Sequence, residues 1–313
     1  MIQTSGLIRH LLKSVATALL LWWVLRQVDI ESGIRLLADS DFALLAAATV
    51  VLALLMVPAT LRWRYVLRNL GLDYPYGLLL QWNLAAGFFN NILPTGVGGD
   101  VLRAEWSRRS GLKIATALES VAVDRLTAFF CLLLLVTASL PFVAPMIEGI
   151  QLQLTPVFIM AALGIVTFLL CLVVLRRLKF RATQYLYELI KRTGGGIGSL
   201  STGPGILVSG LATHIIRVLG VWMIARALNI DISFAVCLLL VPVALLLAMI
   251  PITVGGWGLR EGVFVIVFSQ VQITAVEATA WSVVYGLANL VSSLPGAGIW
   301  IFLKHQPNQE TTK

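Results

Sequence analysis

The sequence predicts an all-α fold, namely a polytopic helical membrane protein. Hydrophobic residues make up 58% of its 313 residues and charged residues only 12%, whereas a soluble domain carries about 25% charged residues. Uncharged runs recur along the chain, and several approach the roughly 20 apolar residues that a helix needs to cross a bilayer. We predict a single integral-membrane domain over residues 1–313, with six full spans plus two oppositely oriented re-entrant helical hairpins in an inverted repeat.

The predicted spans follow from these apolar runs in chain order. The first run is short, but Lys13 and Arg26 can extend it by reaching toward the membrane surface. It lacks a small-residue cleavage site after Leu25, so we interpret it as an uncleaved anchor. The predicted full spans are 14–25, 42–60, 115–146, 155–175, 203–225 and 278–303, and the two predicted re-entrant runs are 78–93 and 235–250.

The Lys and Arg residues predict the orientation. The net charge of +8 is concentrated between spans, which is the pattern of cytoplasmic loops. Basic residues both before and after 78–93 require that run to enter and leave on the same side. The segment 176–202 has the strongest basic signal and is predicted to be a cytoplasmic loop, with an interfacial amphipathic helix over 180–189. We therefore expect a cell inner (cytoplasmic) membrane location with both termini cytoplasmic.

An internal repeat supports the hairpins. Residues 94–103 read PTGVGGDVLR and residues 251–260 read PITVGGWGLR, so six of ten positions are identical at an offset of 157. Three predicted crossings separate the two copies, which inverts the second relative to the first. The predicted halves are 1–146 and 155–305, and inverted repeats with broken helices at their interface are a recurring plan of secondary transporters.

The repeated motif offers a candidate anion site. Its prolines and glycines break the helix, and the half-helix that follows begins with unpaired amides and a positive dipole end. Such an end can bind a phosphate headgroup, and Arg103 and Arg260 follow one turn later. The alternative is that the glycines only permit tight turns and that Asp100 caps the helix. Asn90 and Asn91 can either satisfy freed backbone groups or face a headgroup.

Ionisable residues inside the predicted spans add to the candidates, because such charges are costly in lipid and face a partner or a cavity. Asp124 and Arg125 point to different faces, and a buried ion pair with Arg103 or Arg217 is the structural alternative. His214 and Arg217 share one helix face, and Glu261 is a possible partner of Arg217. The candidate substrate-binding residues are Asn90, Asn91, Pro94, Gly98, Gly99, Asp100, Arg103, Glu119, Asp124, Arg125, Arg217, Gly255, Gly256, Arg260 and Glu261.

Enzyme motifs are missing from the sequence. Cys131, Cys171 and Cys237 all lie in apolar runs, which argues against disulfides and a zinc site. The sequence 39–41 resembles a metal-binding Asp-x-Asp, but a helix cap explains it better, and the glycines at 194–198 lack the pattern of a nucleotide loop. We predict no catalytic residues, no metal and no cofactor, and we expect no nucleic acid as a partner.

Two signatures resemble the lysylphosphatidylglycerol synthase transmembrane-region family, also called flippase-like. The first is Asn91-Ile-Leu-Pro-Thr-Gly-Val-Gly-Gly-Asp100 with Arg103 and Asp124-Arg-Leu126, and the second is 251–256 with Gly258-Leu-Arg-Glu261. The resemblance implies a helical bundle that binds and translocates anionic, aminoacylated or polyprenyl-linked lipid. Where the family often has an acid-Arg or Tyr-Arg pair in its last span, this chain has Tyr285-Gly286. The resemblance does not extend to synthase activity, because the separate soluble domain of bifunctional members is not in this sequence.

The expected function is therefore a lipid-binding membrane transporter, a flippase of phosphate-headgroup lipids. One alternative is an accessory subunit that presents lipid to a separate synthase or glycosyltransferase. The other is an integral-membrane lipid transferase, for which Asp100, Glu119, Asp124 and Glu261 are the candidate acids and bases. The expected partners are membrane lipids and, for the accessory role, a lipid-modifying enzyme.

Overall fold

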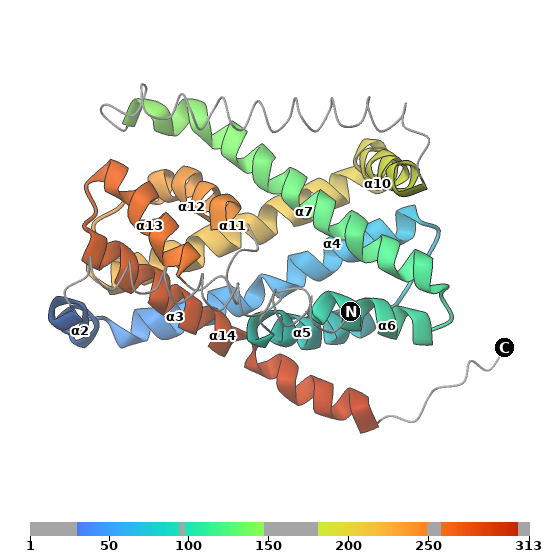
Figure 1. Ribbon diagram of the computed structural model, residues 1–313, viewed down its shortest axis with the longest axis horizontal. Coiled ribbons are helices and arrows are strands. Elements are labelled where there is room, and N and C mark those ends of the chain that lie inside the picture. The colour runs from blue at the N-terminus through green and yellow to red at the C-terminus, as the bar shows by residue number, and fades with distance from the viewer. Residues whose placement is uncertain (1–29, 94–97, 147–180, 249–257, 306–313) are drawn as a thin grey trace, which may run out of the picture.

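A computed structural model describes residues 30–93, 98–146, 181–248 and 258–305 (Figure 1). Over these residues the secondary structure consists of helices, without a strand. Two of the predicted spans, 14–25 and 155–175, lie outside the described residues, as do the hairpin-tip residues Pro94, Gly255 and Gly256.

Among the described residues, four helical stretches are long and apolar enough to cross a membrane, which confirms a polytopic helical membrane protein. The first combines α3 (Phe42–Leu54) and α4 (Met56–Asn69). The others are α7 (Ile114–Val143), α11 (Gly203–Ala227) and α14 (Ala275–His305). They coincide with the predicted spans 42–60, 115–146, 203–225 and 278–303, although the first runs nine residues further, to Asn69.

Helices α5 (Tyr76–Ile92) and α12 (Phe234–Ala248) occupy the predicted re-entrant runs 78–93 and 235–250, and a further short helix follows each of them. The first pair is α5 with α6 (Gly98–Arg109), and the second is α12 with α13 (Leu259–Phe268). Shifted by the repeat offset of 157, α5 would occupy 233–249, against 234–248 for α12. In Figure 1, α12 and α13 lie near the left end of the long axis, whereas α5 lies near the centre with α6 to its right.

The helix pairs pack reciprocally across the halves of the chain. Helix α5 packs against α14 from the second half, and its counterpart α12 packs against α7 from the first half. Helix α11 packs along both α3 and α4. The contacts thus repeat with the same offset as the sequence, while the opposite membrane orientation of the two halves stays a prediction.

The remaining helices are α2 (Ile30–Ala38), α10 (Arg181–Gly198) and the short 3-10 turns η1 (Ala144–Met146) and η2 (Ser269–Val271). Helix α10 lies in the segment predicted as a basic loop, extends beyond the predicted 180–189 helix, and packs against α7 and α11. Asp41 caps α3 by accepting a hydrogen bond from the Leu44 amide at 3.0 Å. The cap interpretation of 39–41 is therefore confirmed.

Two of the hydrophobic clusters adjoin the residues that are described below. The larger one joins α11, α12, α13 and α14 to parts of α3 and α7. The smaller one centres on Trp63 and Trp82, with Tyr74 and Trp106 packed against it. Outward-facing side chains such as Phe42 and Phe142 are 70% and 76% exposed, as expected where a helix faces lipid rather than water.

Candidate functional site

A buried carboxylate lies where α4, α6 and α7 meet. Asp124 on α7 accepts a hydrogen bond from Arg62 Nε at 2.9 Å and another from Arg103 Nη2 at 2.8 Å. Its side chain is 3% exposed, and those of Arg62 and Arg103 are 8% and 6% exposed. The predicted alternative of a buried ion pair between Asp124 and Arg103 is confirmed, with Arg62 as an additional partner.

A second carboxylate extends this network toward the hairpin tip. Asp100, in the first turn of α6, accepts a hydrogen bond from Arg125 Nε at 2.8 Å and lies 3.5 Å from Arg103 Nη1. The Arg103 guanidinium also stacks 3.9 Å from the ring centroid of Trp63. We call Arg62, Asp100, Arg103, Asp124 and Arg125 the first arginine cluster. Since Asp100 is the third residue of α6, it serves as an ion-pair partner rather than as the predicted N-cap residue.

The asparagines before the first hairpin tip have structural partners. Asn90 accepts a hydrogen bond from the Gly99 amide at 2.8 Å, which satisfies one of the unpaired amides at the start of α6. Asn91 and Asn289 of α14 exchange hydrogen bonds at 3.2 and 2.9 Å. A side chain at Gly99 would put its Cβ 1.9 Å from the Ala86 carbonyl oxygen, so this glycine permits close contact between α5 and α6. Gly98 faces only the flexible side chain of Leu93.

Arginines gather again around one turn of α14. Arg217 on α11 donates a hydrogen bond from Nη1 to the Tyr285 hydroxyl at 3.4 Å. Arg260 on α13 donates to Ser282 at 3.1 Å and to Glu261 at 2.7 Å. We call Arg217, Arg260, Glu261, Ser282 and Tyr285 the second arginine cluster.

The predicted pairing of Glu261 with Arg217 is wrong. Glu261 is the third residue of α13, and its Oε2 accepts a hydrogen bond from the Gly258 amide at 2.6 Å, as in one half of a capping box. Its Oε1 faces Arg260 and Ser282. Local capping therefore holds the carboxylate on α13, away from α11.

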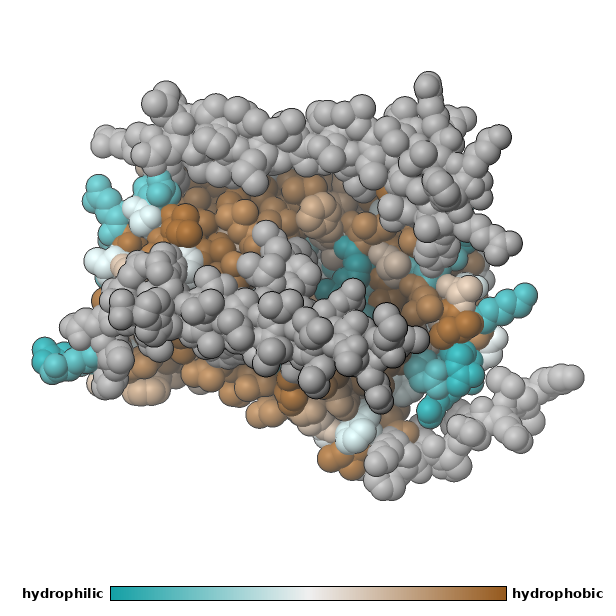
Figure 2. All heavy atoms as spheres, viewed as in Figure 1, coloured by the Kyte–Doolittle hydropathy of each residue, from teal (hydrophilic) through white to brown (hydrophobic). Residues whose placement is uncertain are grey.

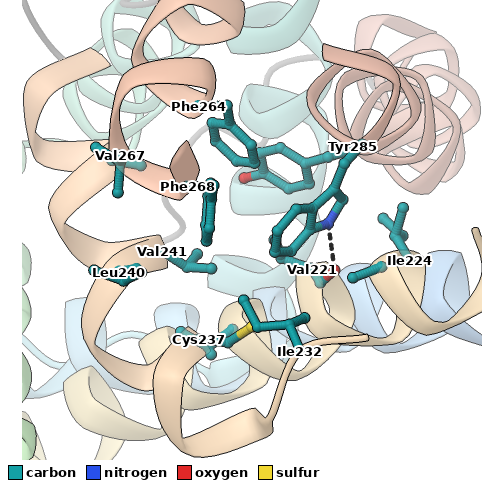
Figure 3. Close-up of a cluster of buried hydrophobic side chains, with 14 of the residues drawn as sticks. Val221, Ile224, Ile232, Cys237, Leu240, Val241, Phe264, Val267, Phe268 and Tyr285 are labelled. Atoms are coloured by element: carbon teal, nitrogen blue, oxygen red, sulfur yellow. Dashed lines mark hydrogen bonds between the residues drawn. The ribbon is translucent and has the colours of Figure 1, made fainter. Parts of the chain in front are cut away.

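Packing fixes the orientation of Tyr285. Its ring stacks on Phe264, with centroids 6.4 Å apart, inside the larger hydrophobic cluster (Figure 3). Its neighbour Gly286 leaves space for Arg260, because a Cβ there would lie 2.3 Å from Arg260 Nη2. The Arg260 guanidinium of α13 thus lies beside the turn of α14 that contains Tyr285 and Gly286.

Other predicted interior charges have separate partners. Glu119 pairs with Arg192 of α10 at 2.9 Å, which links α7 to α10 outside either cluster. The His214 ring contacts the Ala128 carbonyl oxygen through Nε2 at 2.9 Å, while Nδ1 is buried without a hydrogen-bond partner among the described residues. His214 therefore contributes to helix packing on α7.

The basic end of α6 is partly neutralised at the surface. Glu105 accepts hydrogen bonds from Arg108 at 2.7 Å and from Arg109 at 2.9 Å. These contacts lower the pKa of Glu105 to about 2, so this carboxylate stays ionised throughout the physiological range.

In the middle of the molecule, Figure 2 shows hydrophilic side chains recessed within an otherwise hydrophobic face.

Several site residues were not predicted from the sequence. Arg62 was interpreted only as a cytoplasmic topology signal, and Trp63, Ser282 and Tyr285 were not candidates. The signal for Arg62 is that its own helix contains no acidic residue, because a guanidinium in a span then needs a counterion from another helix. Among the described residues, no group of three His, Cys, Asp or Glu side chains is placed to hold a metal ion.

The fold and its interior ion pairs define a multi-pass helical membrane protein with charged groups inside its membrane helices. The family model of the lysylphosphatidylglycerol synthase TM region matches residues 10–296, so the chain belongs to that family. It is similar to a UPF0104 membrane protein of Methanothermobacter thermautotrophicus, with 25% identity over 291 residues and coverage of 83% of each chain.

Proposed function

We propose that the protein is a lipid transporter of the flippase type, which moves a lipid with a phosphate-containing headgroup across the cytoplasmic membrane. The observation that carries the proposal is the excess of guanidinium groups between the membrane helices. The two clusters together contain five arginines and three carboxylates. Uncompensated charge is costly in lipid, so an anionic ligand that enters this region would relieve the imbalance.

The packing of the two hairpins supports transport rather than static binding. Each hairpin contacts the long helix of the other half, α5 on α14 and α12 on α7. Rocking of one half against the other would expose the arginines to each leaflet in turn, the scheme typical of inverted-repeat transporters. The cargo class that fits these arginines is anionic, aminoacylated or polyprenyl-linked lipid. In this proposal the N-terminus and the C-terminus of the protein both lie on the cytoplasmic side of the membrane.

A second candidate is an accessory protein that presents lipid to a separate synthase or glycosyltransferase. The family description favours it, because it names a transmembrane region of a synthase. An accessory protein would co-purify with its enzyme and would move no lipid alone. We do not propose that the chain itself catalyses lipid chemistry.

The test is a translocation assay in proteoliposomes that contain the purified protein and a trace of fluorescent phosphatidylglycerol. A membrane-impermeant reductant bleaches only the outer leaflet, so movement of lipid is seen as bleaching beyond half of the signal. Protein-dependent bleaching, absent from vesicles with an unrelated multi-span membrane protein, is the expected result. Native mass spectrometry of lipids that co-purify with the protein identifies the cargo class. Bleaching that stops at half, for every anionic lipid tried, would refute a flippase and favour the accessory role.

A further inference from the structure

We propose that the lipid phosphate binds at the second arginine cluster, with Arg217 as its main cation and the Tyr285 hydroxyl as a positioning donor. In the first arginine cluster, in contrast, every arginine already contacts a carboxylate, and these contacts clamp the helices together. This inference rests on the proposed function and specifies which of its arginines contact cargo.

The two clusters differ in how many of their guanidinium groups contact a carboxylate. In the first cluster every arginine contacts a carboxylate: Arg62 and Arg103 share Asp124, and Arg125 contacts Asp100. A phosphate at that point would meet two carboxylates that already hold the arginines, so electrostatic repulsion opposes its binding. The ion pairs of the first arginine cluster join α4, α6 and α7, so their role is structural.

Arg217 is the exception among the arginines of the two clusters. No carboxylate lies within 4.0 Å of it in the described part of the chain, and its described hydrogen bond is the long one to Tyr285. Its Nε is buried without a hydrogen-bond partner. A guanidinium offers five donors in a planar fork that matches phosphate oxygens, so most of its donor capacity is unused in this structure.

The neighbours of Arg217 suit an anionic oxygen ligand such as a phosphate. The Tyr285 hydroxyl is held in place by stacking on Phe264, so it can donate to a ligand oxygen when Arg217 turns to the ligand. The Arg260 guanidinium lies 5.7 Å from the centroid of the same tyrosine ring. Both oxygens of Glu261 are engaged on α13, so this carboxylate balances Arg260 and leaves Arg217 uncompensated.

The depth of Arg217 fits a transport intermediate. It follows Gly203 by 14 residues and precedes Ala227 by ten on α11, which places it roughly 21 and 15 Å from the helix ends. A headgroup that crosses the bilayer is least stable near the middle. A cation at that depth stabilises the phosphate where the crossing is otherwise most unfavourable.

The test compares Arg217→Gln and Tyr285→Phe with a control on the same helix, Arg226→Gln, whose exposed side chain pairs with Asp231. The probes are dihexanoyl phosphatidylglycerol, dihexanoyl glycerol without phosphate, and inorganic phosphate, with binding measured by native mass spectrometry and titration. We expect Arg217→Gln to weaken binding of the phosphatidylglycerol by tenfold or more and Tyr285→Phe by roughly fivefold. The Arg226→Gln control should bind like the wild type.

A thermal unfolding measurement separates binding from folding. Arg217→Gln removes an uncompensated interior charge, so its unfolding midpoint should equal or exceed that of the wild type. Unchanged lipid binding in Arg217→Gln, or a loss that is matched by a drop in the unfolding midpoint, would overturn the inference. Inorganic phosphate that binds as tightly as the lipid would overturn the assignment to a headgroup. If the wild type translocates lipid and Arg217→Gln does so equally, only this inference fails. If the wild type neither binds nor moves lipid, the proposed function fails with it.

Discussion

Two arginines from different helices, Arg62 and Arg103, approach the two oxygens of one carboxylate, that of Asp124. All three side chains are less than 10% exposed, so water contributes little to their solvation. Breaking a buried ion pair by removing one partner is far more costly than its formation is favourable, because the remaining charge stays buried. The stability of the first hairpin against α4 and α7 therefore depends on this one side chain.

We expect Asp124→Asn to destabilise the protein by about 3–5 kcal/mol, because it leaves two buried guanidinium groups without their shared counterion. Thermal unfolding in detergent, followed by circular dichroism, measures the change. The control is Glu31→Gln, which breaks a pair with Arg35 whose side chains are 74% and 73% exposed and should change stability by less than about 1 kcal/mol. Equal midpoints for Asp124→Asn and the wild type would show that the clamp does not hold the helices.

At this scale the sequence predicts which residues carry charge into the membrane, but not all of their pairings. Asp124 and Arg125 stand out because charges in apolar runs are conspicuous, and Arg103 stands out because it recurs as Arg260 in the repeated motif. Arg62 does not stand out, because the predicted span ends at residue 60, whereas the helix continues to Asn69. Its partner lies 62 residues away, and no local pattern connects the two. For Glu261 the sequence interpretation is a pairing with Arg217 on another helix, but its position in the first turn of its own helix favours a local cap.

At the level of helices, the main interface is the one between α5 and α14, where the two backbones approach each other closely. Gly296 of α14 faces the main chain of α5, since a Cβ there would lie 2.0 Å from the Leu84 carbonyl oxygen. Gly298, two residues on, has open space around the corresponding position. Small residues at a membrane helix interface allow this kind of close approach.

Gly296→Ala should lower the unfolding midpoint, because the new methyl group must push α14 away from α5. Gly298→Ala is the matched control, and it should leave the midpoint unchanged or raise it slightly, since alanine is favoured over glycine in a helix. Both variants are compared with the wild type in the same detergent. A lower midpoint for Gly298→Ala than for Gly296→Ala would contradict the interface described here.

The repeat in the sequence predicted α5 and α12 to within a few residues, because the apolar runs and the Pro-Gly breaks recur at a fixed offset. Helix α10 was harder to predict beyond residue 189, since three consecutive glycines at 194–196 are unfavourable in a helix. Packing of Thr193 and Gly196 against neighbouring helices overrides that local preference.

Across the whole molecule, the predicted orientation places the two ends of α11 on opposite sides of the membrane. Leu200, before α11, is 97% exposed and is predicted to be cytoplasmic. Asp231, after α11, has a side chain that is 99% exposed and is predicted to be external. We expect Asp231→Cys in intact cells to react with an impermeant maleimide, and Leu200→Cys to react only after the membrane is opened. The background should carry Cys131, Cys171 and Cys237 replaced by alanine. The reverse pattern would invert the topology, and labelling of both from outside would mean that α11 does not cross.

The clamp around Asp124 also has a consequence for how the protein is made. Ribosomes deliver the chain from the N-terminus, so Arg62 enters the membrane environment 62 residues before the aspartate that neutralises it is synthesised. Until α7 emerges, α4 carries a guanidinium that has no counterion within its own helix, a state that is unfavourable in lipid. Biogenesis of the first half is then expected to be concerted, with α4 and the first hairpin retained at the insertion machinery until α7 arrives and releases all of them into the bilayer together.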